Sequence, residues 1–339
     1  MSILAALLVA SLPFHTELHQ VVPDGVGGAG ILRPAPGAEA AWTAPTVRGA
    51  LPFRDALPSW NVDAPPGTAF VVELRVAPEE GRGWSPWLHV GDWGERELLP
   101  ALAQRVARCA AGRVEVDVFL GEGTCATAEL RVRAFARAAG GELRVRRLSL
   151  CLRDRERAVA ALAPPAVRPL GRVLDVPPRS QRAEPAEIAG RICSPTSVAM
   201  LLAFRGVEAS TATVAAAALD PFHDLYGVWP RNVQVAWSLG VPGYVACFSD
   251  WSEVERAILA GTPLVVSLSA RQGELAGAPY ASTPGHLIVL CGFDAAGDCV
   301  VNDPAVSDPA AGRRTYARRE LETVWMRRGG VAYVLEARP

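Results

Sequence analysis

The sequence predicts two domains: an antiparallel β-sandwich of jelly-roll type, followed by an α+β domain. In the first half of the chain, polar and apolar residues alternate with period two, and glycine turns separate the alternating runs. The second half carries helical segments first and apolar, β-branched runs afterwards, an order typical of α+β domains. A segment rich in proline and alanine lies between the halves, and 339 residues suffice for two domains. We therefore expect the sandwich over 1–158, a linker over 159–172 and the α+β domain over 173–339.

Four runs in the first half predict strands. In the last three of them charged and apolar residues alternate, so each strand would bury one face and expose the other. The four runs are 68–76, 114–120, 129–135 and 143–150. Glycines predict turns between strands at 81–83, 121–123 and 140–141.

Four tryptophans of the first half lie in short polar segments: Trp60, Trp84, Trp87 and Trp93. Exposed indole rings would stack on the sugars of a glycan or a cell-wall polymer. Buried rings would instead anchor the core and corners of the sandwich, which is the commoner role of tryptophan. We favour the structural role and keep glycan binding by this domain as an open alternative.

The second half predicts an ordered series of helices and strands. An extended segment at 173–178 leads into it. Apolar runs with start and stop signals predict helices at 195–204, 211–219, 232–239 and 251–259. Runs of apolar and β-branched residues predict strands at 263–269, 286–293, 299–304 and 331–336.

Cys193 is the first candidate for chemistry. It precedes Ser194, which we expect to cap the next helix, and Pro195, which we expect to be its first residue. A thiol at this place lies near the positive end of the helix dipole and the unpaired N–H groups of the first turn. Both favour the thiolate, so the sequence predicts a nucleophile with a lowered pKa.

His286 and Asp303 are the matching base and orienting residue. His286 opens one strand of a predicted hairpin and Asp303 ends the other, so antiparallel pairing would bring them side by side. A thiol, an imidazole and a carboxylate in this arrangement form a nucleophile, a base and a group that orients the base.

Each candidate also has a structural alternative. His286 would otherwise be a hydrogen-bonded core histidine, and Asp303, which precedes a proline, would simply start a turn. His223 is the competing histidine, in an aromatic loop where we expect neither a following strand nor an acidic partner.

Three motifs carry a resemblance to a known family: Cys193 with the Ser-Pro-Thr-Ser that follows it, His286 with the glycine before it, and Asp303 within Asn-Asp-Pro. In this order, over about 173–334, the chain resembles papain-fold cysteine peptidases of the double-glycine leader-peptidase (bacteriocin-processing) type. It is most similar to their soluble bacterial peptidase-like relatives. The resemblance implies a papain-like α+β domain and thiol protease chemistry without a cofactor.

The resemblance also implies a fourth site residue. The family carries a glutamine upstream of the cysteine whose amide helps to bind the oxyanion, and the matching residue is Gln181. The family usually has glycine directly after the nucleophile. Here that residue is Ser194, whose Cβ we expect to crowd the site.

We therefore expect a cysteine peptidase-like hydrolase that cleaves a peptide or isopeptide amide in a peptide or protein substrate. Cys193 would attack the carbonyl, His286 would transfer the proton, and Asp303 would orient His286. Two alternatives remain open: a catalytically inactive papain-like binding module, and an acyltransferase that uses the same residues.

Composition narrows the range of partners. The formal net charge is -1 at pH 7, which gives no electrostatic reason to expect nucleic acid binding. The seven cysteines show no spacing suited to zinc, so we expect neither a metal nor a cofactor. Apart from Cys193 there are three cysteines in each half. An odd number per half disfavours disulfides within domains, so we expect them to be reduced.

The compartment stays open between two expectations. Residues 3–10 are apolar and too short to span a bilayer, and no other segment is a membrane-span candidate. Their length suits a signal peptide, but no arginine or lysine precedes them. The protein would be secreted or held at the cell envelope if residues 1–13 are a signal peptide, complete or truncated, and cytoplasmic otherwise.

Overall fold

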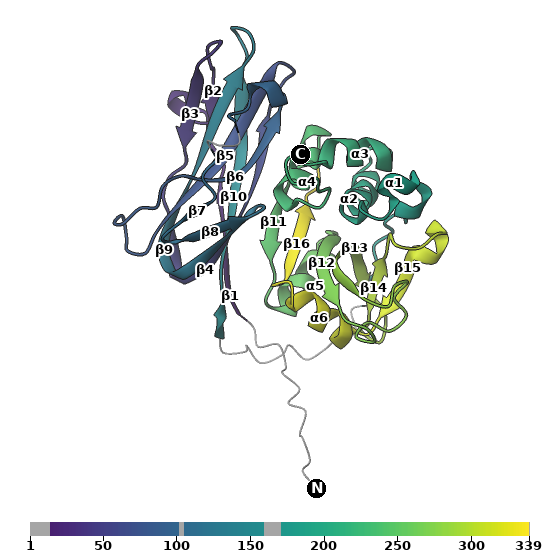
Figure 1. Cartoon of the computed structure of the whole chain (residues 1–339). Helices are drawn as coiled ribbons and strands as arrows, with labels where there is room; N and C mark the ends of the chain where they lie inside the picture. Colours follow the sequence, from purple (N-terminus) through teal and green to yellow (C-terminus); the bar gives the residue numbers. More distant parts are fainter. Residues whose placement is uncertain (1–13, 102–104, 159–170, 339) are drawn as a thin grey trace.

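The structure, a computed structural model, describes residues 14–101, 105–158 and 171–338 (Figure 1). It contains two antiparallel sheets, one in each half of the chain, and the helices longer than one turn all belong to the second half. The predicted signal segment 1–13 lies outside the described residues, as does most of the predicted linker. No helix in the described part is long and apolar enough for a membrane crossing.

The first half forms a ten-stranded antiparallel sheet with the order β1-β10-β4-β9-β5-β6 along its main path. Four short strands pair beside this path: β2 with β10, β3 with β9, and β7 with β8, which also pairs with β9. The strands are β1 (Phe14–Val21), β2 (Ile31–Leu32), β3 (Glu39–Thr43), β4 (Val47–Asp63), β5 (Thr68–Ala77), β6 (Leu88–Gly94), β7 (Arg108–Cys109), β8 (Gly112–Glu115), β9 (Val118–Ala136) and β10 (Leu143–Ala158).

All ten strands belong to one hydrogen-bonded network because the long strands change partners along their length. Strand β9, for example, pairs with β8 and β4 near its start and with β3 and β5 near its end. Side chains of β4, β5, β6, β9 and β10 share one apolar core. The antiparallel prediction is therefore confirmed, while the two-layer jelly-roll arrangement stays a prediction.

The predicted strand at 114–120 is wrong. It is a hairpin in which β8 ends at Glu115 and β9 begins at Val118, with Glu115 paired to Val118. Val116, in the turn, has a φ of 61°, a left-handed conformation that β-branched residues rarely adopt. The predicted turn at 121–123 is wrong as well, because these residues continue β9. Alternation of polar and apolar residues continues through a tight turn, so the pattern does not reveal it.

The four tryptophans occupy two kinds of environment. Trp60 is 1% exposed and meets Phe70 edge to face in the core. Arg75 lies 4.6 Å from the ring centres of both Trp84 and Trp87. The fourth ring is covered in the same way, by Arg231 over Trp93 at 4.9 Å. These contacts occupy ring faces that a sugar would use, and glycan binding stays a prediction.

The second half forms a six-stranded antiparallel sheet with the order β11-β16-β12-β13-β14-β15. Its strands are β11 (Gly243–Cys247), β12 (Leu264–Ala270), β13 (Thr283–Phe293), β14 (Cys299–Asn302), β15 (Arg313–Tyr316) and β16 (Val331–Leu335). Its helices are α1 (Ala186–Ala189), α2 (Cys193–Phe204), α3 (Thr211–Ala218), α4 (Trp229–Ser238), α5 (Trp251–Leu259) and α6 (Arg318–Met326). Figure 1 shows α1 to α4 gathered at the top of this half and α5 and α6 at the bottom. All four predicted helices and all four predicted strands are present.

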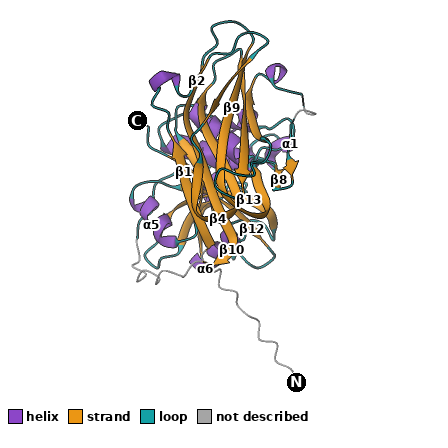
Figure 2. Cartoon of the chain, turned by 90° about the vertical axis from the view of Figure 1, so that its left-hand side faces the viewer, coloured by secondary structure: helices purple, strands orange, loops and turns teal. Residues whose placement is uncertain are grey.

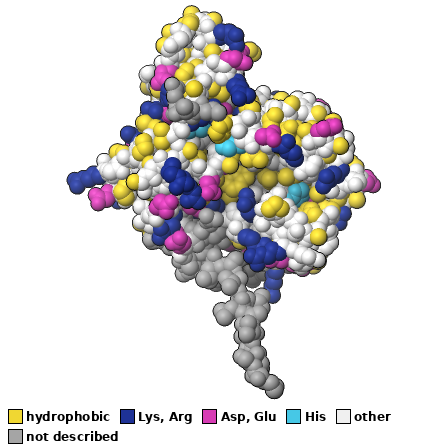
Figure 3. Space-filling model, viewed as in Figure 1, with side chains coloured by type: hydrophobic (Ala, Val, Ile, Leu, Met, Phe, Trp, Pro, Cys, Tyr) yellow, Lys and Arg dark blue, Asp and Glu magenta, His cyan; other side chains and the backbone are white. Residues whose placement is uncertain are grey.

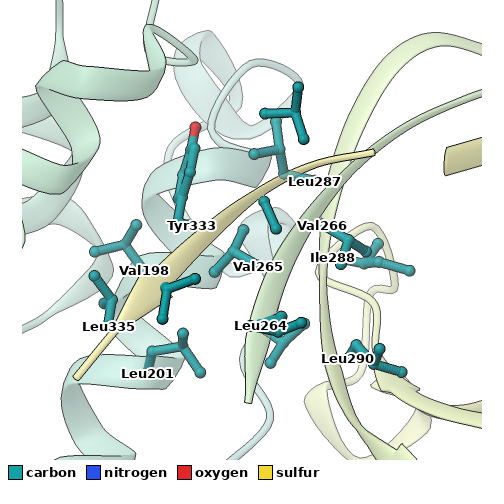
Figure 4. Close-up of a cluster of buried hydrophobic side chains, with 14 of the residues drawn as sticks. Val198, Leu201, Leu264, Val265, Val266, Leu287, Ile288, Leu290, Tyr333 and Leu335 are labelled. Carbon is teal, nitrogen blue, oxygen red and sulfur yellow. The ribbon is translucent and has the colours of Figure 1, made fainter. Parts of the chain in front are cut away.

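Helix α2 is the centre of the second half. It is apolar around its circumference, as expected of a helix enclosed by a core. Val198 and Leu201 pack against side chains of β12, β13 and β16 (Figure 4). This burial fixes the position of the first residue of α2, which is Cys193.

The two halves share a buried polar seam. Strand β11 is an edge strand of the second sheet, and its free N–H groups bind side chains of β4. Gly243 N donates to Asn61 Oδ1 at 3.3 Å, and Val245 N donates to Ser59 Oγ at 2.9 Å. Gln234 of α4 extends the seam with hydrogen bonds to both backbone groups of Val62. Figure 2 shows the long strands of the first sheet lying across the second half.

Candidate active site

Cys193 is the first residue of α2, and the N-cap is Ile192. The predicted cap at Ser194 is therefore wrong by two residues. Pro195 is tolerated inside the first turn because the first N–H groups of a helix have no partner within it. Cys193 lies even closer to the helix N-terminus than expected, where the dipole favours a thiolate.

Ser194 points away from the site. Its side chain is fully buried, and its Oγ lies 2.9 Å from the hydroxyl of Tyr333 on β16. Ser194 does not line the pocket of Cys193, and the expected crowding by its Cβ stays a prediction. The hydroxyl instead ties the start of α2 to the central part of the sheet.

His286 lies on β13, opposite Leu268 of β12. Its Nε2 is 2.8 Å from Oδ1 of Asp303, the residue that follows β14. The hairpin of β13 and β14 thus brings the two side chains together, as the sequence predicts. Because Nε2 faces Asp303, Nδ1 is the ring nitrogen left for the Cys193 thiol, with which His286 interacts.

Asp303 is fully buried and held by several donors. Its Oδ2 accepts a hydrogen bond from the Tyr316 hydroxyl at 2.9 Å, and its Oδ1 accepts one from Ala305 N at 3.0 Å. Burial opposes a charge here, but His286 and these donors lower the pKa of Asp303 below its ordinary value. Asp303 is therefore a fixed anion beside the imidazole.

The Cys193 and His286 pair is polarised toward its charged form. Burial alone would raise the pKa of the Cys193 thiol, but the His286 imidazole and the N–H groups of Leu287 and Ser194 lower it. Burial also disfavours an imidazolium, yet the charge and hydrogen bond of Asp303 and the contact with Cys193 raise the pKa of His286 to about 10. Both shifts favour the thiolate and imidazolium forms of the pair over the neutral forms.

Gln181 lies near Cys193, His286 and Asp303, but it does not line the pocket that opens at Cys193. It is buried in a short 3-10 turn, and its N–H donates to the carbonyl of Pro304, the residue after Asp303. Its Nε2 donates to Ala189 O at 2.7 Å, and its Oε1 accepts no hydrogen bond from the described residues. The structure brings Cys193, His286 and Asp303 together and holds Gln181 near them through the turn after Asp303.

A pocket of about 360 Å³ opens at Cys193 and His286. Its other lining residues mix apolar, small and basic side chains: Gly190, Arg191, Leu225, Tyr226, Gly227, Trp229, Ser267, Gly285, Leu287 and Arg328. Figure 3 shows apolar and basic side chains side by side on this face of the second half. Among the described residues, no cluster of His, Cys, Asp and Glu side chains suits a metal ion.

Two tyrosines support the site, and neither was predicted. The ring of Tyr280 lies 5.0 Å from that of His286, at an interplanar angle of 73°. Tyr316 binds Asp303, as described above. Tyr280 lies in the loop before β13 and Tyr316 ends β15, and no spacing in the sequence distinguishes either from an ordinary core tyrosine.

Asp117 brings the first half of the chain to the pocket. It lies in the turn between β8 and β9, and its Oδ2 accepts a hydrogen bond at 2.7 Å from the backbone N of Trp229, which lines the pocket. Burial raises the pKa of Asp117 to about 7. The first half therefore caps α4 and helps to place one wall of the pocket.

The competing histidine lies elsewhere. The expectation that His223 has no acidic partner is wrong, because its Nδ1 lies 2.7 Å from Asp220 Oδ2. It borders a small polar cavity between the two halves, together with His89 and Asp92. His223 does not line the pocket of Cys193.

Comparison with known proteins agrees with this organisation. Residues 173–333 match the Peptidase C39 like family, and residues 37–152 match the Peptidase C39 N-terminal domain. No curated protein matches the chain.

Solved structures show weaker similarity. A Bacillus anthracis protein described as a C39-like peptidase is 18% identical over 49% of this chain and 98% of its own, with a TM-score of 0.38. A double glycine motif protease, solved with a leader peptide, is 18% identical over 43% of this chain and 84% of its own, with a TM-score of 0.30. From the two family matches, residues 173–333 form a domain of the Peptidase C39 like family, and residues 37–152 form a Peptidase C39 N-terminal domain ahead of it.

Proposed function

We propose that this protein hydrolyses a peptide or isopeptide amide through Cys193, His286 and Asp303. The observation that carries the proposal is the polarised pair at the pocket: a thiol of lowered pKa beside an imidazole of raised pKa, held by a buried carboxylate. A preformed thiolate and imidazolium supply the nucleophile and the acid that amide cleavage needs.

The steps follow from the positions of these groups. The Cys193 thiolate attacks the amide carbonyl, and the His286 imidazolium then protonates the departing amine. A water molecule, deprotonated by the now neutral His286, cleaves the acyl-enzyme and restores the thiolate. Asp303 keeps Nε2 occupied, so that Nδ1 carries each transferred proton.

The developing oxyanion needs hydrogen-bond donors close to Cys193. The backbone N–H of Cys193 is available because it lies in the first turn of α2. Gln181 would supply the second donor: one of its two amide hydrogens binds Ala189 O, and the other remains for the substrate. The hydrogen bond from Gln181 N to the turn after Asp303 supports this role, because it ties the amide to the site.

The proposal extends to the architecture. We assign residues 1–158 to a β-sandwich domain and 173–339 to a papain-like α+β domain, in which the nucleophile helix precedes the sheet that carries the base. The apolar wall formed by Leu225, Tyr226 and Trp229 would take a side chain or an extended segment of a peptide substrate.

Acyl transfer and inactivity are the two competing functions. Acyl transfer would use the same groups with an amine in place of water. The inactive module was suggested by Ser194, whose side chain is hydrogen-bonded to Tyr333 and does not line the pocket.

The test compares the wild-type chain with Cys193→Ala, using a peptide mixture of known sequences and mass spectrometry of the products. New chain ends should form only with the wild type, and the acyl-enzyme should be found on Cys193 after rapid quenching. Cys109→Ala, at a half-buried cysteine of the first sheet, is the matched control and should retain turnover. Added glycine amide should enter the products only if the enzyme is an acyltransferase. Turnover by a folded Cys193→Ala variant would contradict the proposal.

A further inference from the structure

The seam between the two halves aligns two strands in register. Asn61 of β4 binds Gly243 of β11, and Ser59 of β4 binds Val245 of β11. A move of two residues along β4 therefore corresponds to a move of two residues along β11. Side chains on one face of a strand repeat every second residue. The next step therefore places Leu57 of β4 opposite Cys247, the last residue of β11.

Cys151 lies beside Leu57. In the first sheet, Leu57 of β4 pairs with Cys151 of β10, so the register that leads to Cys247 also leads to Cys151. The contacts agree: Cys247, Leu57 and Cys151 belong to one buried cluster, and the two thiols influence each other's pKa. A cysteine from each half thus meets the other across the seam.

A buried cation lies next to the two thiols. Arg153, two residues beyond Cys151 on β10, donates from Nη1 to Cys247 Sγ at 3.7 Å and to Gly329 O at 3.2 Å. It is 3% exposed, and its Nε donates to Asp55 at 2.9 Å. The Cys247 thiol, aided by the Arg153 charge, lowers the pKa of Cys151 in spite of burial.

The pair is reachable from solvent. A pocket of about 230 Å³ is lined by Cys247 and by Thr16, whose hydroxyl lies 3.3 Å from Cys151 Sγ. Leu18 and Phe248 form part of its apolar wall. Cys247 is 6% exposed, so a small molecule that enters this pocket lies against this residue.

We propose that Cys151 and Cys247 form a covalent modification site: an interdomain disulfide made by exchange with a small disulfide that enters this pocket. The pair takes one cysteine from each half of the chain, Cys151 from the first and Cys247 from the second.

The exchange balances in two steps. A thiolate of the pair attacks one sulfur of the small disulfide, forms a mixed disulfide and releases the other half as a thiol after protonation. The second cysteine, deprotonated, attacks the protein sulfur of the mixed disulfide and releases the second small thiol. The protein loses two protons and two electrons, and the small disulfide gains them.

The test uses the full-length chain with Cys193→Ala, so that the pocket nucleophile cannot react, and glutathione disulfide as the probe. Trypsin digestion without reduction should yield a linked pair of peptides, residues 148–153 joined to residues 232–256, in most chains. The oxidised protein should unfold at a temperature several degrees higher, because the link constrains the unfolded chain, and reductant should reverse both changes. Cys291 and Cys299, buried in neighbouring strands of the second sheet, are internal controls that should stay thiols.

Recovery of Cys151 and Cys247 unlinked from the folded chain, as thiols or each bound to glutathione, would overturn the proposal. If Cys193→Ala does not fold, the wild type with Cys193 alkylated gives the same readout. Cys151→Ser and Cys247→Ser should each abolish the linked peptides. None of these measurements depends on peptidase activity, so the result stands apart from the test of the proposed function.

Discussion

The protein holds two thiol sites that differ in the cation beside the sulfur. Cys193 has the imidazole of His286, whereas Cys151 and Cys247 have the guanidinium of Arg153. An imidazolium gives up its proton and takes it back during a reaction, but an arginine stays charged throughout the accessible pH range. At the second site only the pKa of Cys151 is lowered, mainly by Cys247 and in part by Arg153, while burial and Cys151 raise that of Cys247. Of the two cations, only histidine also serves as acid and base. The first site therefore suits repeated turnover and the second suits disulfide exchange.

The sites also differ in what else their residues do. Cys193 begins a helix, lines a pocket of about 360 Å³ and packs against the edge of the core of the second half. Arg153 is part of the seam between the halves, where it binds a carboxylate, a carbonyl and a thiol. Loss of the cation should therefore affect reactivity at the first site and stability at the second.

The largest effect should come from Arg153→Met. Methionine keeps much of the volume but removes the charged partner of Asp55 and the donor to Gly329 O. Breaking a buried ion pair by removing one partner costs about 3 kcal/mol or more of unfolding free energy. Urea unfolding measures this loss. Cys193 in the folded variant should still be alkylated at the wild-type rate, and a slower rate would show that the two sites are not independent.

His286→Ala should have the next largest effect, on reactivity alone. The thiolate forms above the lowered pKa of Cys193, and the imidazolium persists up to a pKa of about 10 for His286, so the wild-type pair is charged between these limits. Without the imidazole the thiol pKa returns to about 8.5 or higher, and at about pH 6.5 iodoacetamide should modify Cys193 about 100-fold more slowly. The rate is measured by peptide mass spectrometry across pH. Equal profiles for variant and wild type would contradict a thiolate and imidazolium pair.

Asp117→Asn tests the contact of the first half with the catalytic pocket. Burial raises the pKa of Asp117 to about 7 in the folded protein, compared with about 3.9 in the unfolded chain. Between these two pH values the folded state binds the proton of Asp117 more tightly than the unfolded state does. Stability from this group is present at low pH and is lost as the pH rises through about 7. Asparagine keeps an acceptor for Trp229 N and carries no charge. The variant should gain about 4 kcal/mol relative to the wild type between pH 4 and pH 8.

The charged neighbours set the size of that gain. Asp220 raises the pKa of Asp117 and Arg328 lowers it, while Tyr333 lies close enough to sense its charge. Thermal unfolding of both proteins at several pH values measures the difference. A constant difference between them at every pH would mean that Asp117 is ionised throughout.

Much of the candidate site was predictable because it depends on local patterns. A thiol before an apolar helix, and a histidine and an aspartate at facing ends of a hairpin, need only the periodicity of strands and helices to be brought together. The helix start was placed two residues late, because Ser-Pro is the usual signature of a cap and a first residue. Here the Ser194 hydroxyl has a better partner in Tyr333, more than a hundred residues away.

The remaining features depend on long-range contacts that no local pattern reveals. The alternation of polar and apolar residues at 114–120 continues through a tight turn between β8 and β9. Asp117 lies in this turn and accepts a hydrogen bond from Trp229 N at the start of α4, in the other half of the chain. Tyr280 and the register of Cys151 with Cys247 likewise follow from the packing of separate elements.

Ser194→Gly should have the smallest effect on reactivity. Glycine removes the hydroxyl that binds Tyr333, and the variant should lose about 1 kcal/mol of unfolding free energy because a buried hydroxyl is left without this partner. The Cys193 alkylation rate should not change, since the serine side chain points away from the pocket. Tyr333→Phe is the matched control, because it removes the same hydrogen bond from the other side. Faster alkylation of Cys193 in Ser194→Gly, but not in Tyr333→Phe, would mean that the Cβ of Ser194 hinders access to the Cys193 thiol. The two thiol sites would then differ in steric access as well as in the cation beside the sulfur.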